Sequence, residues 1–138
     1  MKPIQIKSIF KTKLQPPEVC AYILDINQWP KFRVCGVLPG IKRAEFERKP
    51  KEIVGSRIKV ISDNKTTYIE EITEWNASSG VSLMFMEFSP PIKYLTTHFI
   101  ETIEFRIASR QAAATRTMIM YPRNKIGRLL LIPVSRLM

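Results

Sequence analysis

Three carboxylates are the side chains of this sequence best suited to acid–base chemistry. In three predicted strands, Glu71, Glu87 and Glu101 occupy the same alternate positions as the apolar residues, so they would point to the same face of the sheet. A carboxylate that faces an apolar groove has a raised pKa, because burial disfavours its charged form, and it becomes a candidate general acid or base. The alternative is a position at the groove rim, hydrated or paired with Arg57, Arg106 or Arg116, because a register slip of one residue would turn each glutamate outward.

The hairpin around residues 63–66 decides which glutamate faces the core. A tight turn there places Lys59 opposite Glu70, and it places Ile58 opposite Glu71. The face with Glu71 carries one charged residue and the face with Glu70 carries four, so we expect the first face to be buried. Glu70 then needs no function, since Lys59 is a sufficient partner for it.

The residues predicted to line a ligand groove lie on this same face of the middle strands. One more comes from the C-terminal segment. This predicted ligand-binding set is Ile58, Val60, Ile69, Glu71, Leu83, Phe85, Glu87, Phe99, Glu101, Ile103, Phe105 and Leu130. Catalytic residues are not assigned.

The methionines allow two interpretations. Met84, Met86 and Phe88 share one face of their strand, and Met118 and Met120 share a face of theirs. On a face opposite the core they would form an exposed apolar patch, which usually marks an interface such as a homodimer contact. Under a different register they belong to the core.

The elements that must position these residues are several strands and a few short helices. Residues 4–12 alternate as a strand. A helix is expected from residues 15–18 to Asn27 or Gln28, ended by Pro30, with Val19, Tyr22, Ile23 and Ile26 buried. Residues 31–40 form a second short helix or a loop. An antiparallel meander follows, with strands at 41–48, 56–62, 67–75, 81–88, 97–107 and 115–121.

The C-terminal segment from Asn124 to Met138 reads as a helix with Asn124 as its N-cap. Its predicted buried stripe is Ile126, Leu130, Val134 and Leu137. Pro133 predicts a kink or an early end. The segment either covers the core of the sheet or lies as an amphipathic helix on a membrane surface.

Composition limits the partners. The chain of 138 residues has a net charge of +10, with seven basic and no acidic side chains in residues 105–138. Such a surplus attracts anionic lipid, nucleic acid or an acidic ligand, or it is a solvated surface. No basic run is dense and no nucleic-acid motif accompanies the charge, so nucleic acid is not expected.

The remaining motifs point to no metal and no cofactor. Cys20 and Cys35 have no metal or redox spacing, and residues 1–14 do not form a signal peptide, which favours a cytoplasmic location. His98 is expected to be a packed or surface residue.

Five short segments, in this order and spacing, resemble the START-like (SRPBCC) superfamily, which includes polyketide cyclase and dehydrase-like domains. They are Pro17-Glu18-Val19, Trp29-Pro30-Lys31-Phe32, Val54-Gly55-Ser56-Arg57, Ile72-Thr73-Glu74-Trp75 and Thr115-Arg116-Thr117. The resemblance covers nearly the whole chain and implies one α+β domain over residues 1–138. Its helix-grip fold would have a curved antiparallel sheet, two short helices after the first strand and a short C-terminal helix.

Members of this superfamily typically hold a hydrophobic ligand between the sheet and a long C-terminal helix. The resemblance therefore implies a module that binds or transports a small hydrophobic molecule, of the lipid or polyketide class. The alternatives are a cyclase or dehydratase that uses groove glutamates, and a basic adaptor on an anionic membrane. The shortness of the last helix here implies a truncated chain or a partner subunit, as in a homodimer, that completes the cover.

Overall fold

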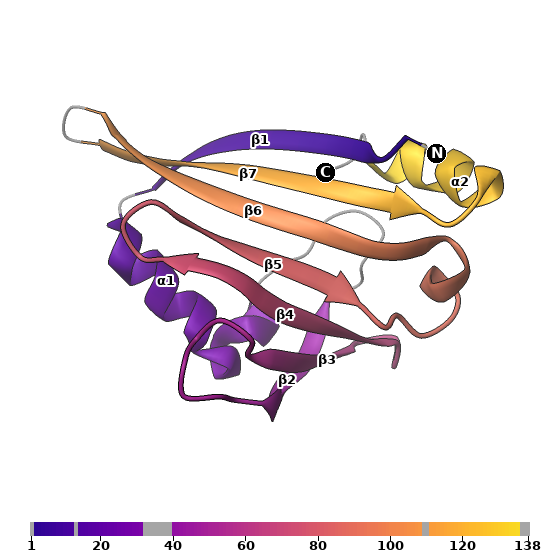
Figure 1. Cartoon of the computed structure of the whole chain (residues 1–138), viewed down its shortest axis with the longest axis horizontal. Coiled ribbons are helices and arrows are strands. Elements are labelled where there is room, and N and C mark those ends of the chain that lie inside the picture. Colours follow the sequence, from indigo (N-terminus) through magenta and orange to yellow (C-terminus); the bar gives the residue numbers. More distant parts are fainter. Residues whose placement is uncertain (1, 13, 32–39, 109–110, 136–138) are drawn as a thin grey trace.

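The computed structural model describes residues 2–12, 14–31, 40–108 and 111–135 (Figure 1). Strands and helices follow the expected order. They are β1 (Ile4–Thr12), α1 (Pro16–Leu24), the 3-10 helix η1 (Ile26–Lys31), β2 (Ile41–Arg48), β3 (Arg57–Ser62), β4 (Thr67–Asn76), β5 (Gly80–Met86), the 3-10 helix η2 (Ile92–Tyr94), β6 (Thr96–Ala108), β7 (Gln111–Pro122) and α2 (Lys125–Ser135).

The strands form one seven-stranded antiparallel sheet in the order β1-β7-β6-β5-β4-β3-β2. At one long edge η1 contacts β2, and at the other α2 contacts β1 and β7, whereas η2 lies beside β6 (Figure 1). The α+β class, the antiparallel meander, and the order of short helices after the first strand and a short C-terminal helix are therefore confirmed.

The buried core lies on one face of this sheet, which we call the inner face. It joins side chains of the strands to Cys20 of α1, Trp29 of η1 and Leu131 of α2. Aromatic rings occupy its centre: Tyr68 stacks on Phe85 with 5.7 Å between ring centroids. The methionines of β7, Met118 and Met120, belong to this core, as does Phe88 after β5, whereas Met84 and Met86 are half-buried on the outer face.

The predicted register of the β3–β4 hairpin is wrong by one residue. In the structure Ile58 pairs with Glu70, and Lys59 pairs with Ile69. The cause is the loop, which has three residues between Ser62 and Thr66 instead of two. Its last residue, Lys65, has a positive φ of 70°, as in three-residue hairpin loops.

Side-chain hydrogen bonds hold this loop in place. The Asn64 side-chain oxygen accepts hydrogen bonds from the Thr66 backbone N–H at 3.1 Å and from the Thr66 hydroxyl at 2.6 Å. Asparagine favours such local turns because its side chain mimics a backbone carbonyl. The extra loop residue turns Glu70 inward and Glu71 outward.

The first helical region also departs from the prediction. The α-helix ends at Leu24, and η1 continues the chain with Pro30 inside it. Asp25, at ψ 80°, interrupts the helix. Trp29 is then buried, and its indole N–H donates to the Ile23 carbonyl at 3.0 Å. Of the predicted buried stripe, Tyr22 is 48% exposed, and Pro16 and Cys20 are the buried residues of α1. The segment predicted at 31–40 falls almost wholly on residues 32–39, outside the described part.

Helix α2 begins where it was predicted to begin, but it buries a different face from the predicted one. The Asn124 side chain accepts a hydrogen bond from the Gly127 N–H at 2.7 Å, which confirms the N-cap. The buried positions, however, are Gly127 and Leu131, whereas Ile126 and Leu130 are 69% and 51% exposed. The predicted stripe is thus wrong for those two residues; the side chains of Val134 and Leu137 lie outside the described part.

The glycine explains this rotation. A Cβ at Gly127 would lie 2.2 Å from the Leu95 carbonyl oxygen, so only glycine lets the helix approach this backbone. The helix also continues past Pro133 to Ser135, so of the two alternatives predicted for Pro133, a kink or an early end, the early end is wrong.

Candidate functional site

A polar cluster lies on the inner face of the sheet among apolar side chains. It consists of Tyr68 and Glu70 on β4, Glu101 on β6 and Arg116 on β7. The strand register places these four side chains on the inner face, because each pairs across strands with buried core residues. Glu70, for example, lies between Ile58 on β3 and Phe85 on β5.

Glu101 and Arg116 form the charged half of this inner cluster. The Arg116 guanidinium donates to the Glu101 carboxylate at 2.7 Å, and the two side chains are 30% and 12% exposed. Arg116 also borders a cavity of about 10 Å³ that is lined by Ile6, Ser8 and Met118. That volume has room for about one water molecule.

Glu70 is the second carboxyl group of this cluster. Its side chain is buried, and among the described residues it has no hydrogen-bond or ion-pair partner. Burial raises the pKa of this carboxyl group well above its usual range, and the nearby Glu101 charge raises it further, while Arg116 acts in the opposite direction. The raised pKa favours the protonated form of Glu70, which can donate a hydrogen bond.

Tyr68 adds a second unused donor. Its hydroxyl is buried and has no partner within the described ranges. Burial raises the pKa of the phenol, and the carboxyl groups of Glu70 and Glu101 raise it further when they are ionised, so the group stays protonated. A buried polar group without a partner costs roughly 1–3 kcal/mol. This hydroxyl, on the inward position next to the buried Glu70 carboxyl, calls for an explanation.

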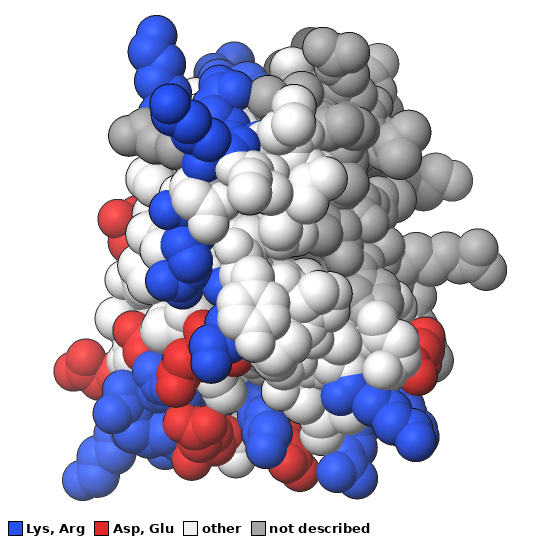
Figure 2. Space-filling view, turned by 90° about the vertical axis from the view of Figure 1, so that its right-hand side faces the viewer, with Lys and Arg blue, Asp and Glu red and all other residues white. Residues whose placement is uncertain are grey.

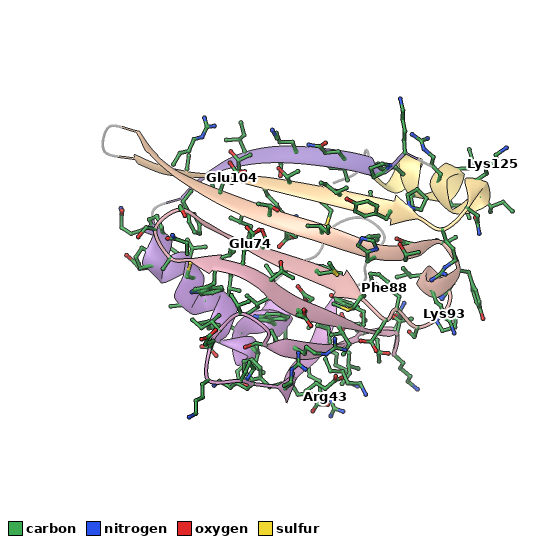
Figure 3. The ribbon with its side chains drawn as sticks, in the orientation of Figure 1. Arg43, Glu74, Phe88, Lys93, Glu104 and Lys125 are labelled. Carbon is green, nitrogen blue, oxygen red and sulfur yellow. The ribbon has the colours of Figure 1, made fainter. Side chains whose placement is uncertain are left out.

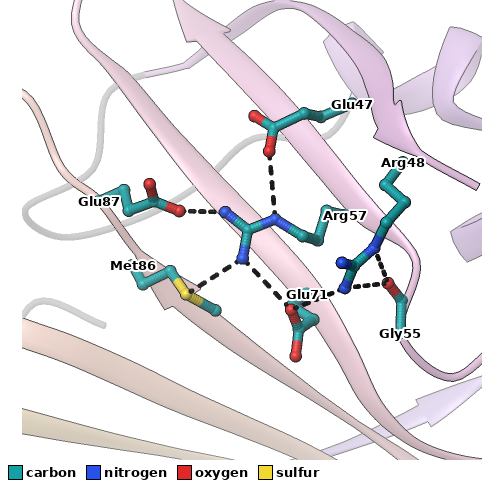
Figure 4. Close-up of polar contacts among 7 residues, drawn as sticks. All are labelled: Glu47, Arg48, Gly55, Arg57, Glu71, Met86 and Glu87. Atoms are coloured by element: carbon teal, nitrogen blue, oxygen red, sulfur yellow. Dashed lines mark hydrogen bonds and ion pairs between the residues drawn. The ribbon is translucent and has the colours of Figure 1, made fainter.

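Glu71 and Glu87 lie instead in an ion-pair cluster on the outer side (Figure 4). Arg57 donates to Glu47 at 3.2 Å and to Glu71 at 3.3 Å, and it also pairs with Glu87. Strand β5 ends at Met86, and Glu87 has a positive φ of 54°, which turns it away from the inner face. This cluster links β2 to the end of β5, and it offers no buried carboxylate.

Only part of the predicted ligand-binding set lies on the inner face. The structure places Ile58, Val60, Leu83, Phe85, Phe99, Glu101, Ile103 and Phe105 on the inner face. The inward placement of Ile69, Glu71 and Glu87 is wrong, and Leu130 is exposed. The prediction missed Tyr68 and Glu70 because it assumed a two-residue loop, and it counted Arg116 only as a rim partner.

A wider groove of about 450 Å³ lies where β4, β5 and β6 meet the β4–β5 turn. Its lining includes Trp75, Ile103 and Phe105, the last two from the predicted set. The strand register places Ser82, Thr102 and Glu104, which also line this groove, on the outer face, so much of the groove lies on the side of the sheet opposite the inner polar cluster.

Solved structures share this architecture. Ara h 8.0201 superposes with a TM-score of 0.69 at 12% sequence identity, covering 89% of this chain and 80% of that chain. Major latex-like protein 151 from Panax ginseng superposes at 0.67 and 12% identity, covering 99% of this chain and 94% of its own. The chain has the helix-grip fold.

The helix-grip assignment extends to a third structure, a point mutant of norcoclaurine synthase from Thalictrum flavum in complex with a transition-state analogue. It superposes with a TM-score of 0.70 at 10% identity, covering 97% of this chain and 86% of that chain. No family model matches the sequence, and no curated protein matches it. The resemblance to the START-like superfamily is thus confirmed at the level of the fold.

Proposed function

We propose that the chain, working as one module over residues 1–138, binds a small and mainly apolar molecule against the inner face of its sheet. The observation that carries this proposal is the unpartnered Tyr68 hydroxyl beside the buried Glu70 carboxyl, whose raised pKa favours its protonated form, within an apolar core. A bound ligand that accepts their hydrogen bonds would remove the cost of leaving them unpaired.

The chemistry of the inner cluster selects the kind of ligand. Glu70 and Tyr68 both present O–H donors, so the complementary group is a neutral carbonyl or hydroxyl oxygen. Arg116 is already paired with Glu101, so a charged head group would have to displace an existing ion pair. The neighbouring Leu83, Phe85 and Phe99 suit an apolar body. A lipid-like or polyketide-like molecule with a neutral oxygen meets these requirements.

The comparisons support this proposal by fold alone. Among the similar structures, norcoclaurine synthase is a complex with a small molecule by its own description, so the fold is compatible with such a ligand. A cyclase or dehydratase working through Glu71, Glu87 and Glu101 is not favoured, because the first two lie outside the inner face and Glu101 is paired with Arg116.

The proposal also includes a cytoplasmic location and a homodimer. The buried thiol of Cys20 is free, which suits a reducing cytoplasm. The homodimer stays a prediction, and its methionine argument is weaker, because Met118 and Met120 lie in the core.

The test begins with native mass spectrometry of gently purified protein, followed by organic extraction to identify any bound molecule. A naphthalene sulfonate fluorescent probe is then displaced with decan-2-one, which has a neutral carbonyl, and with decanoate. We expect displacement by the ketone at lower concentration than by decanoate. Absence of both extra mass and probe binding would contradict the proposal.

The matched variants are Tyr68→Phe and Tyr94→Phe, because Tyr94 is 61% exposed and lies outside the inner face. Loss of one hydrogen bond should weaken ketone binding by roughly fivefold in Tyr68→Phe, at about 1 kcal/mol per bond. Tyr94→Phe should bind like the unchanged protein. Equal binding by both variants would remove Tyr68 from the site.

A further inference from the structure

Apolar side chains gather on the outward side of helix α2. Ile126, Leu129 and Leu130 are 69%, 69% and 51% exposed, and their spacing places them on one face of the helix. The opposite face, with Gly127 and Leu131, packs on the protein. Exposing an apolar helix face to water is unfavourable, so a binding partner is expected to cover this face.

Backbone contacts hold η2 beside the start of this helix and add another exposed ring. The Arg123 N–H donates to the Leu95 carbonyl at 2.9 Å, and its guanidinium Nε donates to the Lys93 carbonyl at 3.0 Å. Tyr94, between those two residues, is 61% exposed. The α2 end of the molecule therefore carries four large exposed apolar side chains from two elements.

The same end is surrounded by positive charge. Its basic residues are Lys2, Lys93, Arg123, Lys125 and Arg128. The Arg128 side chain reaches the Lys2 carbonyl at 3.4 Å, which places the N-terminal lysine beside α2. Residues 88–100 and 105–138 contain no Asp or Glu.

The figures show this separation of charge. Lys93 and Lys125 project from the same end of the molecule (Figure 3). In the view onto that end, blue and white groups occupy the upper left, whereas the red groups lie mainly in the lower part (Figure 2).

We propose that this end of the molecule docks on an anionic lipid bilayer. Exposed leucine, isoleucine and tyrosine side chains enter the boundary between head groups and acyl chains, while the surrounding cations contact anionic head groups. In the described part of the chain no helix is long and apolar enough to cross a membrane.

Charge complementarity selects this occupant. A second copy of the chain would bring an equal set of cations to the contact and would be repelled. Nucleic acid would satisfy the cations but leave three aliphatic side chains of α2 in water. An anionic bilayer satisfies both features. This inference stands apart from the proposed ligand, because it uses none of the inner-face residues.

The apolar contribution is tested by co-sedimentation with vesicles of 70% phosphatidylcholine and 30% phosphatidylserine. The variant Leu129→Ser/Leu130→Ser removes two exposed side chains, and its matched control Ile9→Ser/Val54→Ser removes two others that are 73% and 44% exposed elsewhere. We expect the α2 variant to bind at least roughly tenfold more weakly, from the apolar area withdrawn from the bilayer, and the control to bind unchanged. Circular dichroism checks that both variants are folded.

The electrostatic contribution is tested with Lys93→Glu/Lys125→Glu against the control Lys42→Glu/Lys51→Glu, all four lysines being exposed. A loss of roughly fivefold or more per lysine is expected at the α2 end. Binding should also fall as salt rises and be weak on pure phosphatidylcholine vesicles.

Three results would overturn the inference. The first is no binding to the anionic vesicles, and the second is equal loss in the α2 variants and their controls. The third is a concentration-dependent dimer, seen by analytical ultracentrifugation, that Leu129→Ser/Leu130→Ser abolishes, because a second copy would then be the occupant.

Discussion

The pair Glu70→Gln and Glu71→Gln tests the inner cluster and the strand register together. These neighbours lie on opposite faces of β4: Glu70 is buried between Ile58 and Phe85, and Glu71 is paired with Arg57 on the outer side. Glutamine has nearly the same size as glutamate but cannot ionise. Any difference between the variants that depends on pH therefore reports the buried carboxyl.

The sign follows from the raised pKa of Glu70. Above its ordinary pKa of 4.5, the unfolded chain releases the Glu70 proton while the folded protein keeps it. The folded state then binds more protons, so the free energy of unfolding falls as pH rises from there to the raised pKa. Glu70→Gln lacks this loss, and its stability relative to the unchanged protein grows by up to about 1.4 kcal/mol per pH unit.

The assay is urea unfolding at several pH values from 4 to 8. Near pH 4 the unchanged protein and Glu70→Gln should differ little, because both carry a neutral side chain at this position. At pH 7 Glu70→Gln should be clearly more stable. Glu71→Gln should show no such growth and lose no more than about 1 kcal/mol, as is typical of partly exposed ion pairs. If Glu71→Gln shows the pH-dependent gain instead, the register that places Glu70 inward is wrong.

Three further variants test the packing around the inner face by urea unfolding. Asn124→Ala removes the cap of α2 and should cost about 1 kcal/mol, while Asn124→Ser keeps most of it. Gly127→Ala places a Cβ 2.2 Å from the Leu95 carbonyl oxygen and should cost about 1–3 kcal/mol; an unchanged stability would mean that α2 does not pack here. Arg116→Met leaves the Glu101 carboxylate without its partner and should cost about 2 kcal/mol, less than a fully buried pair because Arg116 is 30% exposed. The double variant with Glu101→Gln should lose less than the sum of the single changes; additive losses would argue against the ion pair.

The order and limits of the strands could be predicted from the sequence because alternation and turn residues act locally. The strands at 4–12 and 41–48 have the predicted bounds. The N-cap of α2 was also predictable, since an asparagine before an apolar helical pattern needs no tertiary contact to act. The resemblance to the START-like superfamily gave the fold for the same reason, because it rests on the order of such local signals.

The orientation of two elements could not be predicted because each depends on one extra contact or residue. A loop of three residues instead of two turns β4 over, and the approach of Gly127 to the Leu95 backbone rotates α2. The spacing of apolar residues shows which of them share a face of an element. The buried face is then taken to be the one with fewer charged residues. That rule is reliable only where the buried face contains no charged residue.

The same rule explains why the candidate site was missed. Counting charges on β4 favoured the face of Glu71, because the face of Glu70 contains more ionisable side chains. A site that binds a polar group of a ligand inside an apolar core needs polar side chains on the buried face. Its strand therefore departs from the alternation of apolar buried and polar exposed residues. The buried carboxyl and phenol lower stability unless a partner meets them, so local preference argues against their placement. On β4 the mismatch between pattern and structure coincides with the two donors that the proposed ligand would satisfy.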